Sequence, residues 1–497
     1  MAGGARLALA LAVVLAFAGA SPAAGDRHSG LTDSIPAAGD RTAESTAKDA
    51  TTAAVTPDDA AATGAPTDDA GADGTTTWTA DQSADETVEI ETEGFDPDYD
   101  PATVLDRVER LRDLPALQGI TLHEYEPPAD ETYDARDVFG GIRPAGAKAL
   151  QLYSNASTER RAPLGYTVER QAAVHIYLLN DSALAAFNVS QRAVLAHEFV
   201  HALQFQHDLL SPSRAALQSE FPRWTTDARL VTTALVEGDA MWVTEQYLRR
   251  YGGGDYSVTE YNRTLTRPAW THSVAGTPYY YGYAFYERAG SAPTERTAAI
   301  RDPPGSTAEL LHPGERLEPA SIPDAPEIPE SAEFSRIHAD TAGELVVRHA
   351  LRMNGLSFSR AAAAADGWAA DRMFYYAAGG AAGPATRWVT VWESAGEARE
   401  FADAWRAMLA ANGAAAPGGE GDGTVSVPAS DQAPGMHYEI ARDGATVRIT
   451  AAERPETVDR LGDAIAEGAE AAVDSEPDVD SAAGTNESGA VSSPRRP

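Results

Sequence analysis

The stretch RAVLAHEFVHALQFQH, residues 192–207, constrains the fold more than any other part of the chain. Its apolar residues recur at helical spacing, and Ser190 before it is a suitable N-cap. Within this apolar helix stand two histidines and a glutamate, His197, Glu198 and His201. Burying such polar groups costs free energy unless each has a partner. The fold must therefore bring a metal ion or other polar side chains to this helix.

His197 and His201 are the two histidines of H-E-x-x-H, one helical turn apart and on one side of the helix. Two imidazoles so placed can bind one tetrahedral ion, and Zn²⁺ is the usual ion for nitrogen and oxygen ligands with an open position. Glu198 is placed to accept a proton from a metal-bound water, as a general base does. The sequence therefore predicts a zinc site. The alternative is an ordinary helix with two hydrogen-bonded histidines and a solvated glutamate.

A third protein ligand is required, and two residues are candidates. His207 would extend the motif to H-E-x-x-H-x-x-Q-x-x-H. If the helix continues through Gln204, however, His207 lies about 280° round the helix from His197 and faces the wrong way. Glu237, in ALVEGDAMWVTE on the next predicted helix, can lie beside both imidazoles if the two helices form a hairpin. We favour Glu237.

Further candidates lie downstream. Ligand histidines usually donate their second N–H to a carboxylate, and Asp239 and Glu245 are available on the second helix. Attack of a metal-bound water on a carbonyl group also needs a donor for the oxyanion that develops during the reaction. The segment THSVAGTPYYYGYAFYERAG offers His272 and Tyr279–Tyr281, although such aromatic clusters more often form a core or a substrate cleft. His312, which precedes a proline, is a weaker candidate.

The extended motif resembles that of metzincins, except that Gln204 stands where their glycine ends the helix. LAHEFVHALQFQH and ALVEGDAMW together resemble gluzincins, in which a downstream helix supplies a glutamate as third ligand and a nearby acidic residue orients a ligand histidine. Over roughly residues 190–410 the chain is similar to secreted haloarchaeal surface proteins with a gluzincin-type domain. The pieces that carry this broader similarity are PYYYGYAFYE, STAELLHP and GWAADRMFYY…RWVTVWESAGEAREFADAW. The resemblance implies a zincin-like fold and a zinc metallopeptidase with ligands His197, His201 and Glu237.

The charge composition indicates a protein adapted to high salt and argues against nucleic-acid binding. The chain has 74 acidic and 39 basic residues, a net charge of −35, and only two lysines, Lys48 and Lys148. Such a surface is typical of a protein that stays soluble at high salt, where screening removes self-repulsion. Nucleic-acid binding needs a basic surface and is not expected. The absence of cysteine excludes disulfides and thiolate metal sites.

The ends of the chain predict export and disorder. Residues 1–20 have the layout of a cleaved secretory signal, with one arginine, a short apolar run and small residues at 18–20. Residues 21–97 and 471–497 are rich in small and acidic residues and almost free of large apolar ones, so we predict disorder. No second apolar run is long enough to span a membrane. We expect an exported protein, released or held at the cell surface.

Between these ends we predict an α+β fold in two domains. The first, 98–330, is a mainly helical zincin-like domain with a small sheet, and the second, 335–470, is a smaller α+β domain. The predicted helices are 101–114, 190–210, 225–250, 341–366, 397–411 and 456–469. The predicted strands are 148–153, 172–180, 372–378, 387–393 and a hairpin over 436–450 that turns at Asp443-Gly444.

The predicted function is hydrolysis of a peptide or protein substrate by a zinc-activated water, with Glu198 as base. One alternative is a non-catalytic surface protein that keeps a structural metal site. Another is a zinc hydrolase that acts on a non-peptide amide.

Overall fold

The computed structural model describes residues 88–474 with several internal gaps. The gaps are 95, 126–145, 153–163, 171–172, 186–188, 212–224, 253–256, 266–272, 316, 318–319, 323–327, 329–332, 380–382, 415–423 and 432. The predicted export signal, most of the predicted acidic segment and most of the predicted tail lie outside the described residues. Within them the chain has an α+β fold with two sheets.

The first sheet has four strands in the order β1-β2-β4-β3. The strands are β1 (Ile90–Glu93), β2 (Ile120–Tyr125), β3 (Gly165–Arg170) and β4 (Ala173–Leu179). The first three strands across the sheet are parallel, and helix α1 (Pro101–Arg112) connects β1 to β2. β3 pairs antiparallel with β4 and forms one edge of the sheet.

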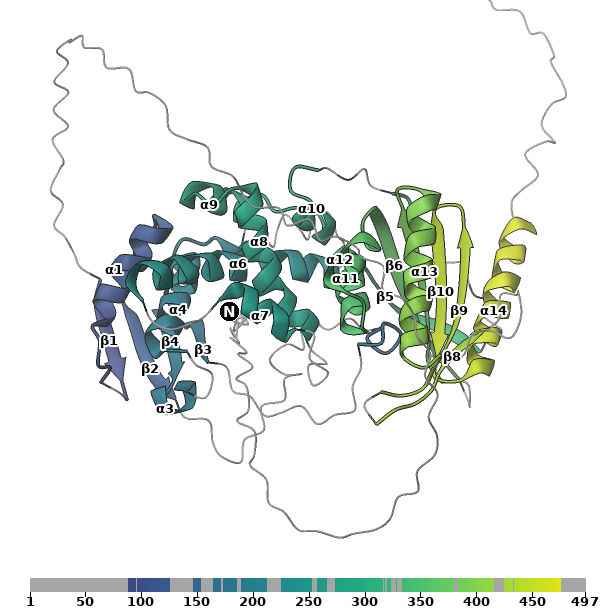
Figure 1. Ribbon diagram of the computed structural model, residues 1–497, viewed down its shortest axis with the longest axis horizontal. Coiled ribbons are helices and arrows are strands. Elements are labelled where there is room, and N and C mark those ends of the chain that lie inside the picture. The colour runs from purple at the N-terminus through teal and green to yellow at the C-terminus, as the bar shows by residue number, and fades with distance from the viewer. Residues whose placement is uncertain are drawn as a thin grey trace, which may run out of the picture. The chain divides into compact units, whose positions relative to one another are not determined.

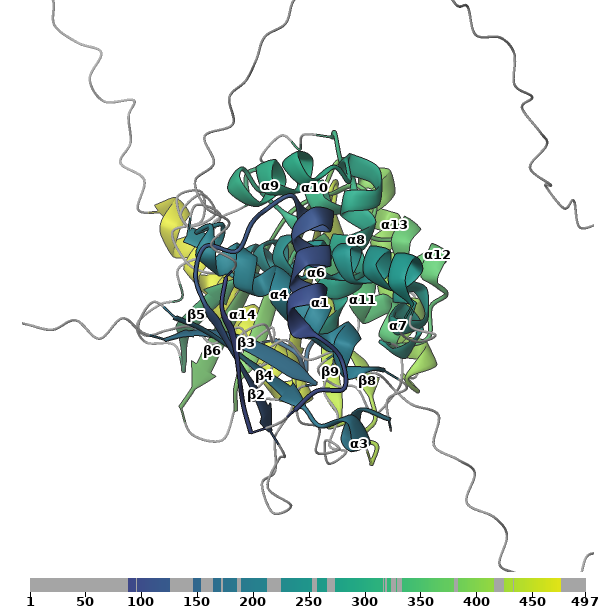
Figure 2. The same cartoon turned by 90° about the vertical axis from the view of Figure 1, so that its left-hand side faces the viewer.

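Helix α4 (Gln191–Gln206) packs on this sheet against β3 and β4, with α1 and α6 (Thr226–Tyr251) on its other sides (Figures 1 and 2). Ser190 caps it, because its side chain accepts a hydrogen bond from the backbone N–H of Ala193. Because neighbours surround it, α4 is apolar on nearly every face, as a buried helix must be. Its histidines therefore lie inside the domain.

Helix α8 (Thr277–Ala289) packs closely along α6 (Figure 1). The two helices meet at Gly238 and Gly282. A Cβ atom on Gly238 would lie 2.2 Å from the carbonyl carbon of Gly282, and one on Gly282 would lie 1.8 Å from the carbonyl oxygen of Ala234. Only glycine permits this approach at both positions. The contact fixes α8 against α6 at Gly238, the residue that follows Glu237.

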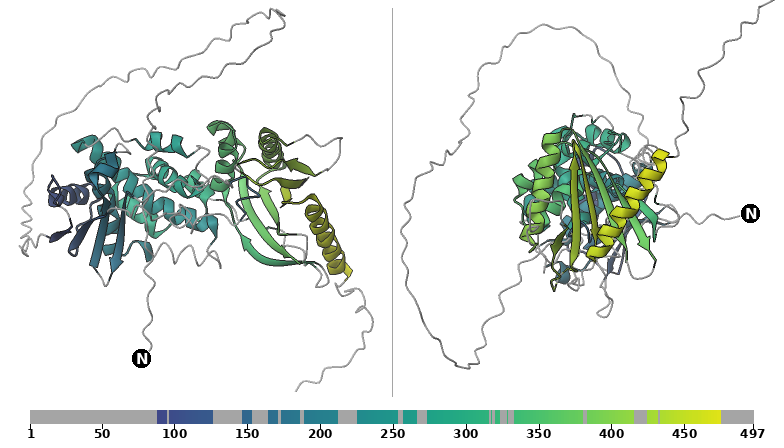
Figure 3. Two further views of the ribbon diagram at one scale, coloured as in Figure 1. Left: turned by 90° about the horizontal axis from the view of Figure 1, so that it is seen from below. Right: turned by 90° about the vertical axis from the view of Figure 1, so that its right-hand side faces the viewer.

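The second sheet has six antiparallel strands in the order β5-β6-β7-β10-β9-β8. Their bounds are β5 (Phe334–Asp340), β6 (Trp368–Ala378), β7 (Ala385–Trp392), β8 (Val425–Val427), β9 (Met436–Asp443) and β10 (Thr446–Ala452). Helix α13 (Ala395–Ala411) packs Phe401 and Trp405 on one face, and α14 (Pro455–Asp474) packs Val458 and Leu461 on the other (Figure 3).

Shorter helices complete the described fold. They are α3 (Asp181–Leu184), α7 (Val258–Thr264), η2 (Ser273–Gly276), α9 (Pro293–Arg301), α10 (Thr307–Leu311), α11 (Glu344–Met353) and α12 (Phe358–Ala363). One core cluster contains Leu230 of α6, Tyr281 of α8 and Leu345 of α11, together with residues of the second sheet. None of the described helices combines the length and apolar character that a bilayer span requires.

Most predicted elements are confirmed within a few residues, but four predictions are wrong. The predicted helix 341–366 is two helices, α11 and α12, because the chain leaves the helical conformation at Gly355, whose φ is +100°. Residues 148–152 form turns instead of a strand, because Leu150 and Leu152 are buried in a core cluster without a partner strand. Order begins before Asp98, since β1 lies inside the predicted disordered segment. β1 has little apolar character and is held by backbone pairing with β2. At the other end, α14 continues to Asp474, past the predicted start of the tail at 471.

Candidate metal centre

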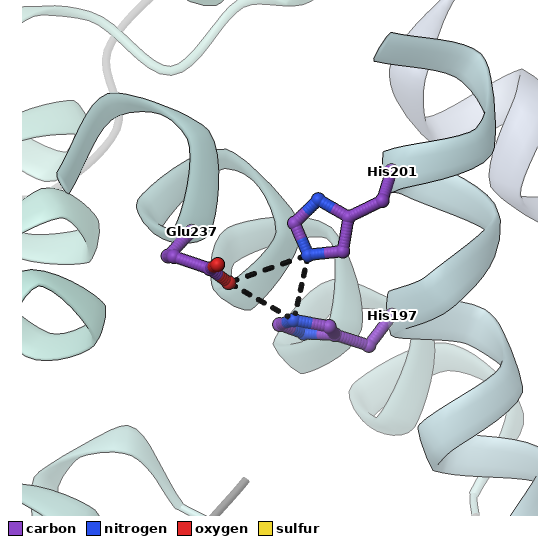
Figure 4. A group of neighbouring side chains, drawn as sticks. All are labelled: His197, His201 and Glu237. Carbon is purple, nitrogen blue, oxygen red and sulfur yellow. Dashed lines mark hydrogen bonds and ion pairs between the residues drawn. The ribbon is translucent and has the colours of Figure 1, made fainter. Parts of the chain in front are cut away.

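Three polar side chains from two neighbouring helices, α4 and α6, converge inside the fold. His197 and His201 extend from α4, and Glu237 extends toward them from α6 (Figure 4). The side chains are 0%, 1% and 2% exposed respectively. The structure thus brings together the three residues that the sequence predicts as ligands, and they form the group in the described part of the chain that could hold a metal ion.

The spacing of the three ligand atoms fits a tetrahedral ion. The two Nε2 atoms of His197 and His201 lie 3.1 Å apart, and Oε2 of Glu237 lies 3.4 Å and 3.3 Å from them. Ligand atoms about 2.0–2.1 Å from a tetrahedral zinc would lie about 3.3 Å from each other. Charge-assisted hydrogen bonds between the same groups would be shorter, about 2.7–2.9 Å. The triangle therefore matches one face of a coordination tetrahedron.

The hydrogen-bond network assigns the proton on His201. Nε2 of Gln204 donates to the carbonyl oxygen of Val236 and to Oδ2 of Asp239, so its amide orientation is fixed. Its Oε1 lies 2.9 Å from Nδ1 of His201 and must accept a hydrogen bond from it. Nδ1 of His201 therefore carries a proton, and Nε2 faces the other two ligands.

The same logic applies to His197. The hydroxyl of Thr244 donates to the carbonyl oxygen of Ala240 at 2.7 Å, and its oxygen lies 3.3 Å from Nδ1 of His197. Nδ1 of His197 therefore donates to Thr244, and its Nε2 lone pair faces the Nε2 of His201. Within the described residues, Oε2 of Glu237, also buried, has no hydrogen-bond partner. Such a group needs positive charge between its members, supplied by a metal ion or by a proton on one imidazole.

Burial and charge act on the pKa values in opposite directions. Burial lowers the pKa of His197 to about 4. Burial also acts to lower the pKa of His201, but the charge of Glu237 outweighs it and raises that pKa to about 9. For Glu237, burial opposes the charged form, but the charge of His201 and the adjacent imidazole of His197 lower its pKa to about 2. The centre thus combines an ionised carboxylate with a neutral imidazole from His197.

Glu198, the predicted base, is also fully buried. Its Oε2 accepts a hydrogen bond of 2.7 Å from the hydroxyl of Thr167 on β3, whereas its Oε1 has no hydrogen-bond partner in the described part of the chain. Burial raises the pKa of Glu198 to about 8. Gly165 leaves room for this carboxylate, because a Cβ there would lie 2.9 Å from Oε1. One oxygen of Glu198 is therefore anchored by Thr167 while the other is buried without such an anchor.

The other candidates from this part of the chain contact groups other than the ligand histidines. His207 follows the end of α4, where its Nε2 donates to the carbonyl oxygen of Pro115, so it faces away from the other histidines as predicted. Asp239 contacts Gln204 instead of a ligand histidine. Glu245 forms a surface ion pair with Arg249 and does not hold a ligand histidine, so that alternative is wrong.

Of the aromatic candidates, Tyr279 lies beside the centre. Its ring is nearly parallel to that of His197, with ring centres 6.5 Å apart. Tyr280 packs against Tyr281 and Phe358. Tyr281 is buried near two arginines of α11. His272 lies outside the described residues.

His312 is held elsewhere in the fold. Its Nε2 lies 3.1 Å from both carboxylate oxygens of Glu344, at the start of α11. We therefore assign it to the contact between α10 and α11.

Two residues of the centre were missed by sequence reasoning. Gln204 was considered only because metzincins have a glycine at that position, and Thr244 was not considered. A usable signal was present for Gln204, since a residue three positions after His201 lies on the same helix face. No comparable signal marks Thr244, because its position beside His197 depends on how α6 packs on α4.

Comparison with known proteins gives little functional information. Residues 332–462 match the model of a domain of unknown function, DUF8575, which covers the second sheet and overlaps the predicted second domain. No curated protein and no solved structure matches the chain.

Proposed function

We propose that this chain is a secreted, zinc-dependent hydrolase of the metallopeptidase type, with a zincin-like first domain. One observation carries the proposal: three ligand atoms converge at tetrahedral spacing, and two of them come from the helix that also bears a carboxylate with one unpartnered oxygen. His197, His201 and Glu237 would hold the ion, and two imidazoles with one carboxylate are a ligand set typical of catalytic zinc. This set leaves the fourth position open for water.

Glu198 would act as general base and then as general acid. A bound zinc ion would lower the pKa of a water and polarise the carbonyl under attack. Oε1 of Glu198 would take the proton from that water and deliver it to the leaving nitrogen. Thr167 would hold the carboxylate in place through Oε2, so that proton transfer requires little rearrangement.

The edge strand β3 supports a peptide as substrate. Gly165 and Thr167 of β3 lie against Glu198, and β3 is at the edge of the first sheet. An extended peptide can add to such an edge through backbone hydrogen bonds. This placement would bring a peptide bond close to the proton-accepting oxygen.

Substitution of Glu198 by glutamine tests the proposal. The variant keeps the size of the side chain and the acceptor for Thr167 but cannot accept a proton. We expect wild-type protein, purified in high salt, to contain about one zinc per chain by elemental analysis and to cleave casein. Glu198→Gln should keep its zinc and lose at least about 100-fold in cleavage rate, the lower range for general-base catalysis. Equal cleavage by both proteins would refute the role of Glu198.

A structural metal site is the second candidate function. The burial of all three ligands, at most 2% exposed, favours it, because structural sites are closed to solvent whereas catalytic sites keep an open position. It predicts zinc in both proteins and cleavage by neither. The same experiment therefore separates the two functions.

Export is proposed on the N-terminal sequence alone. We expect the mature protein to begin after Ala20 when it is produced in a halophilic host, with mass spectrometry of the N-terminal peptide as the measurement. Detection of intact residues 1–20 in the extracellular protein would contradict cleavage.

A further inference from the structure

Behind the metal centre lies a buried ionic cluster that joins three helices. Asp239 of α6 accepts hydrogen bonds from Nε of Arg112 at 2.8 Å and from Nε of Arg296 at 2.7 Å, and all three side chains are 0% exposed. Arg112 ends α1 and Arg296 belongs to α9. Both guanidinium groups also donate to backbone carbonyls, of Pro293 and Leu111 respectively. The position of Asp239 is therefore fixed from both sides.

Gln204 connects this cluster to the metal centre. Its amide nitrogen donates to Oδ2 of Asp239 at 2.9 Å, and its amide oxygen accepts from Nδ1 of His201 at 2.9 Å. The amide has one donor end and one acceptor end, and each faces the group that needs it. Reversal of the amide would place its nitrogen against the Nδ1 proton and its oxygen against a carboxylate.

We propose that Gln204 is the positioning residue of the metal ligand His201, and that Asp239 acts on this ligand only through Gln204. This inference rests on the proposed metal site and assigns it a support that no comparison indicates. Gln204 fixes the proton on Nδ1 and so directs the Nε2 lone pair of His201 at the ion. It also separates His201 from the charge of Asp239 by a neutral group, whereas a direct carboxylate partner would make the imidazole more basic.

The test compares Gln204→Met with Gln206→Met, since Met has a similar volume but neither donor nor acceptor. Gln206 is the matched control: it lies on the same helix, and its amide bonds the backbone of Leu117 and Gln118 instead of the metal centre. We expect Gln204→Met to weaken zinc binding 10- to 100-fold, measured by competition with a chelator. The zinc affinity of Gln206→Met should stay within about threefold of wild type, a smaller change than the one expected for Gln204→Met.

A second measurement is independent of zinc. Nδ1 of His201 should carry a slowly exchanging proton, visible by NMR of protein with ¹⁵N-labelled histidine, in metal-free and zinc-loaded wild type. This signal should vanish in Gln204→Met and persist in Gln206→Met. If wild type binds no zinc but shows the signal, the proposed function fails while the hydrogen bond stands. If wild type lacks the signal, the positioning role is refuted.

Gln204→Glu keeps the test decisive if the methionine variant does not fold. Glutamate retains an acceptor for Nδ1 of His201 but places a carboxylate against Asp239. We expect the His201 proton signal to remain and thermal stability to fall. Folded Gln204→Glu without that signal, or folded Gln204→Met with zinc affinity within threefold of wild type, would overturn the proposal.

Discussion

Asp227 and Glu237 are both buried carboxyl groups of α6, yet their surroundings have opposite effects on charge. Glu237 faces two imidazoles, and its pKa falls to about 2 although burial opposes ionisation. At Asp227, burial raises the pKa to about 7, with further contributions from Asp340 and Asp371. Hydrogen bonds from Thr307 reach Oδ1 of Asp227, while Oδ2 has no hydrogen-bond partner among the described residues. Asp227 is therefore a group whose ionisation opposes folding.

The contribution of Asp227 to stability should fall as pH rises between about 4 and 7. In this range the folded state keeps a proton that the unfolded state, with a pKa near 3.9, has released. The contribution is at most about 4 kcal/mol. Asp227→Asn removes the ionisable group, so its unfolding free energy should decline less over this range than that of wild type. Denaturant unfolding from pH 4 to 7 measures this, and parallel curves would contradict it.

The identity of the third ligand gives a second prediction at the residue scale. Glu237→Ala removes one of three ligands and should lower zinc occupancy and affinity by at least about 100-fold, since a remaining pair of histidines binds weakly. His207→Ala is the control, because its ring contacts Pro115 and should leave zinc binding unchanged. Elemental analysis after dialysis measures both. Zinc loss in His207→Ala alone would restore the metzincin-like alternative.

At the scale of elements, the contact of α6 with α8 fixes the helix that supplies Glu237. Gly238→Ala adds a methyl group 2.2 Å from the backbone of Gly282, where no flexible side chain can yield. We expect a loss of at least about 1–3 kcal/mol in unfolding free energy, the range for overpacking. This outweighs the gain of about 1 kcal/mol from alanine in a helix.

Gly462→Ala on α14 provides the matched control. A Cβ there would meet only the carboxylate of Glu439, at an ordinary 3.8 Å. The helix-propensity gain of about 1 kcal/mol should then remain. Thermal unfolding of both variants measures the difference, and equal shifts in the same direction would show that the α6–α8 contact does not limit stability.

The helix predictions are confirmed where apolar residues at helical spacing mark the packed side of a helix. In α1, for example, Val104, Val108 and Leu111 are all buried. The hairpin of β9 and β10 also formed, although its loop is Gly444-Ala445, one residue later than predicted. The strand predictions failed where a neighbouring strand decides whether a segment forms a strand. Residues 148–152 have a strand-like composition but do not pair with a strand in the described structure, whereas β1 has few apolar residues but pairs with β2.

At the scale of the whole molecule, the two predicted domains share contacts that their sequences did not reveal. Asp340, at the end of β5, accepts hydrogen bonds from the backbone and hydroxyl of Thr226, at the start of α6. Thr307 at the start of α10 donates to Asp227 and accepts from the backbone of Leu345 in α11. A core cluster continues across these contacts. The DUF8575 region therefore supports the helix that carries Glu237.

A chain that ends at residue 331 should consequently fail to fold cooperatively. It would expose the apolar residues of the shared cluster and leave Thr226 and the start of α6 without its cap from Asp340. We expect no sharp thermal transition by circular dichroism and no stoichiometric zinc, in contrast to the full chain under the same conditions. A cooperative transition with bound zinc in the shortened chain would show that the first domain folds alone.

The sequence by itself determined the parts of the centre that local geometry dictates. One helical turn places His197 and His201 on one side, and the apolar surroundings of Glu198 favour its burial. The sequence also limited the third ligand to Glu237 or His207. Only the tertiary structure placed Glu237, and not His207, beside the two imidazoles and revealed Gln204, Thr244 and the cluster around Asp239. These depend on the angle and distance at which α6 meets α4, which packing with α1, α8 and α9 sets over long separations in sequence.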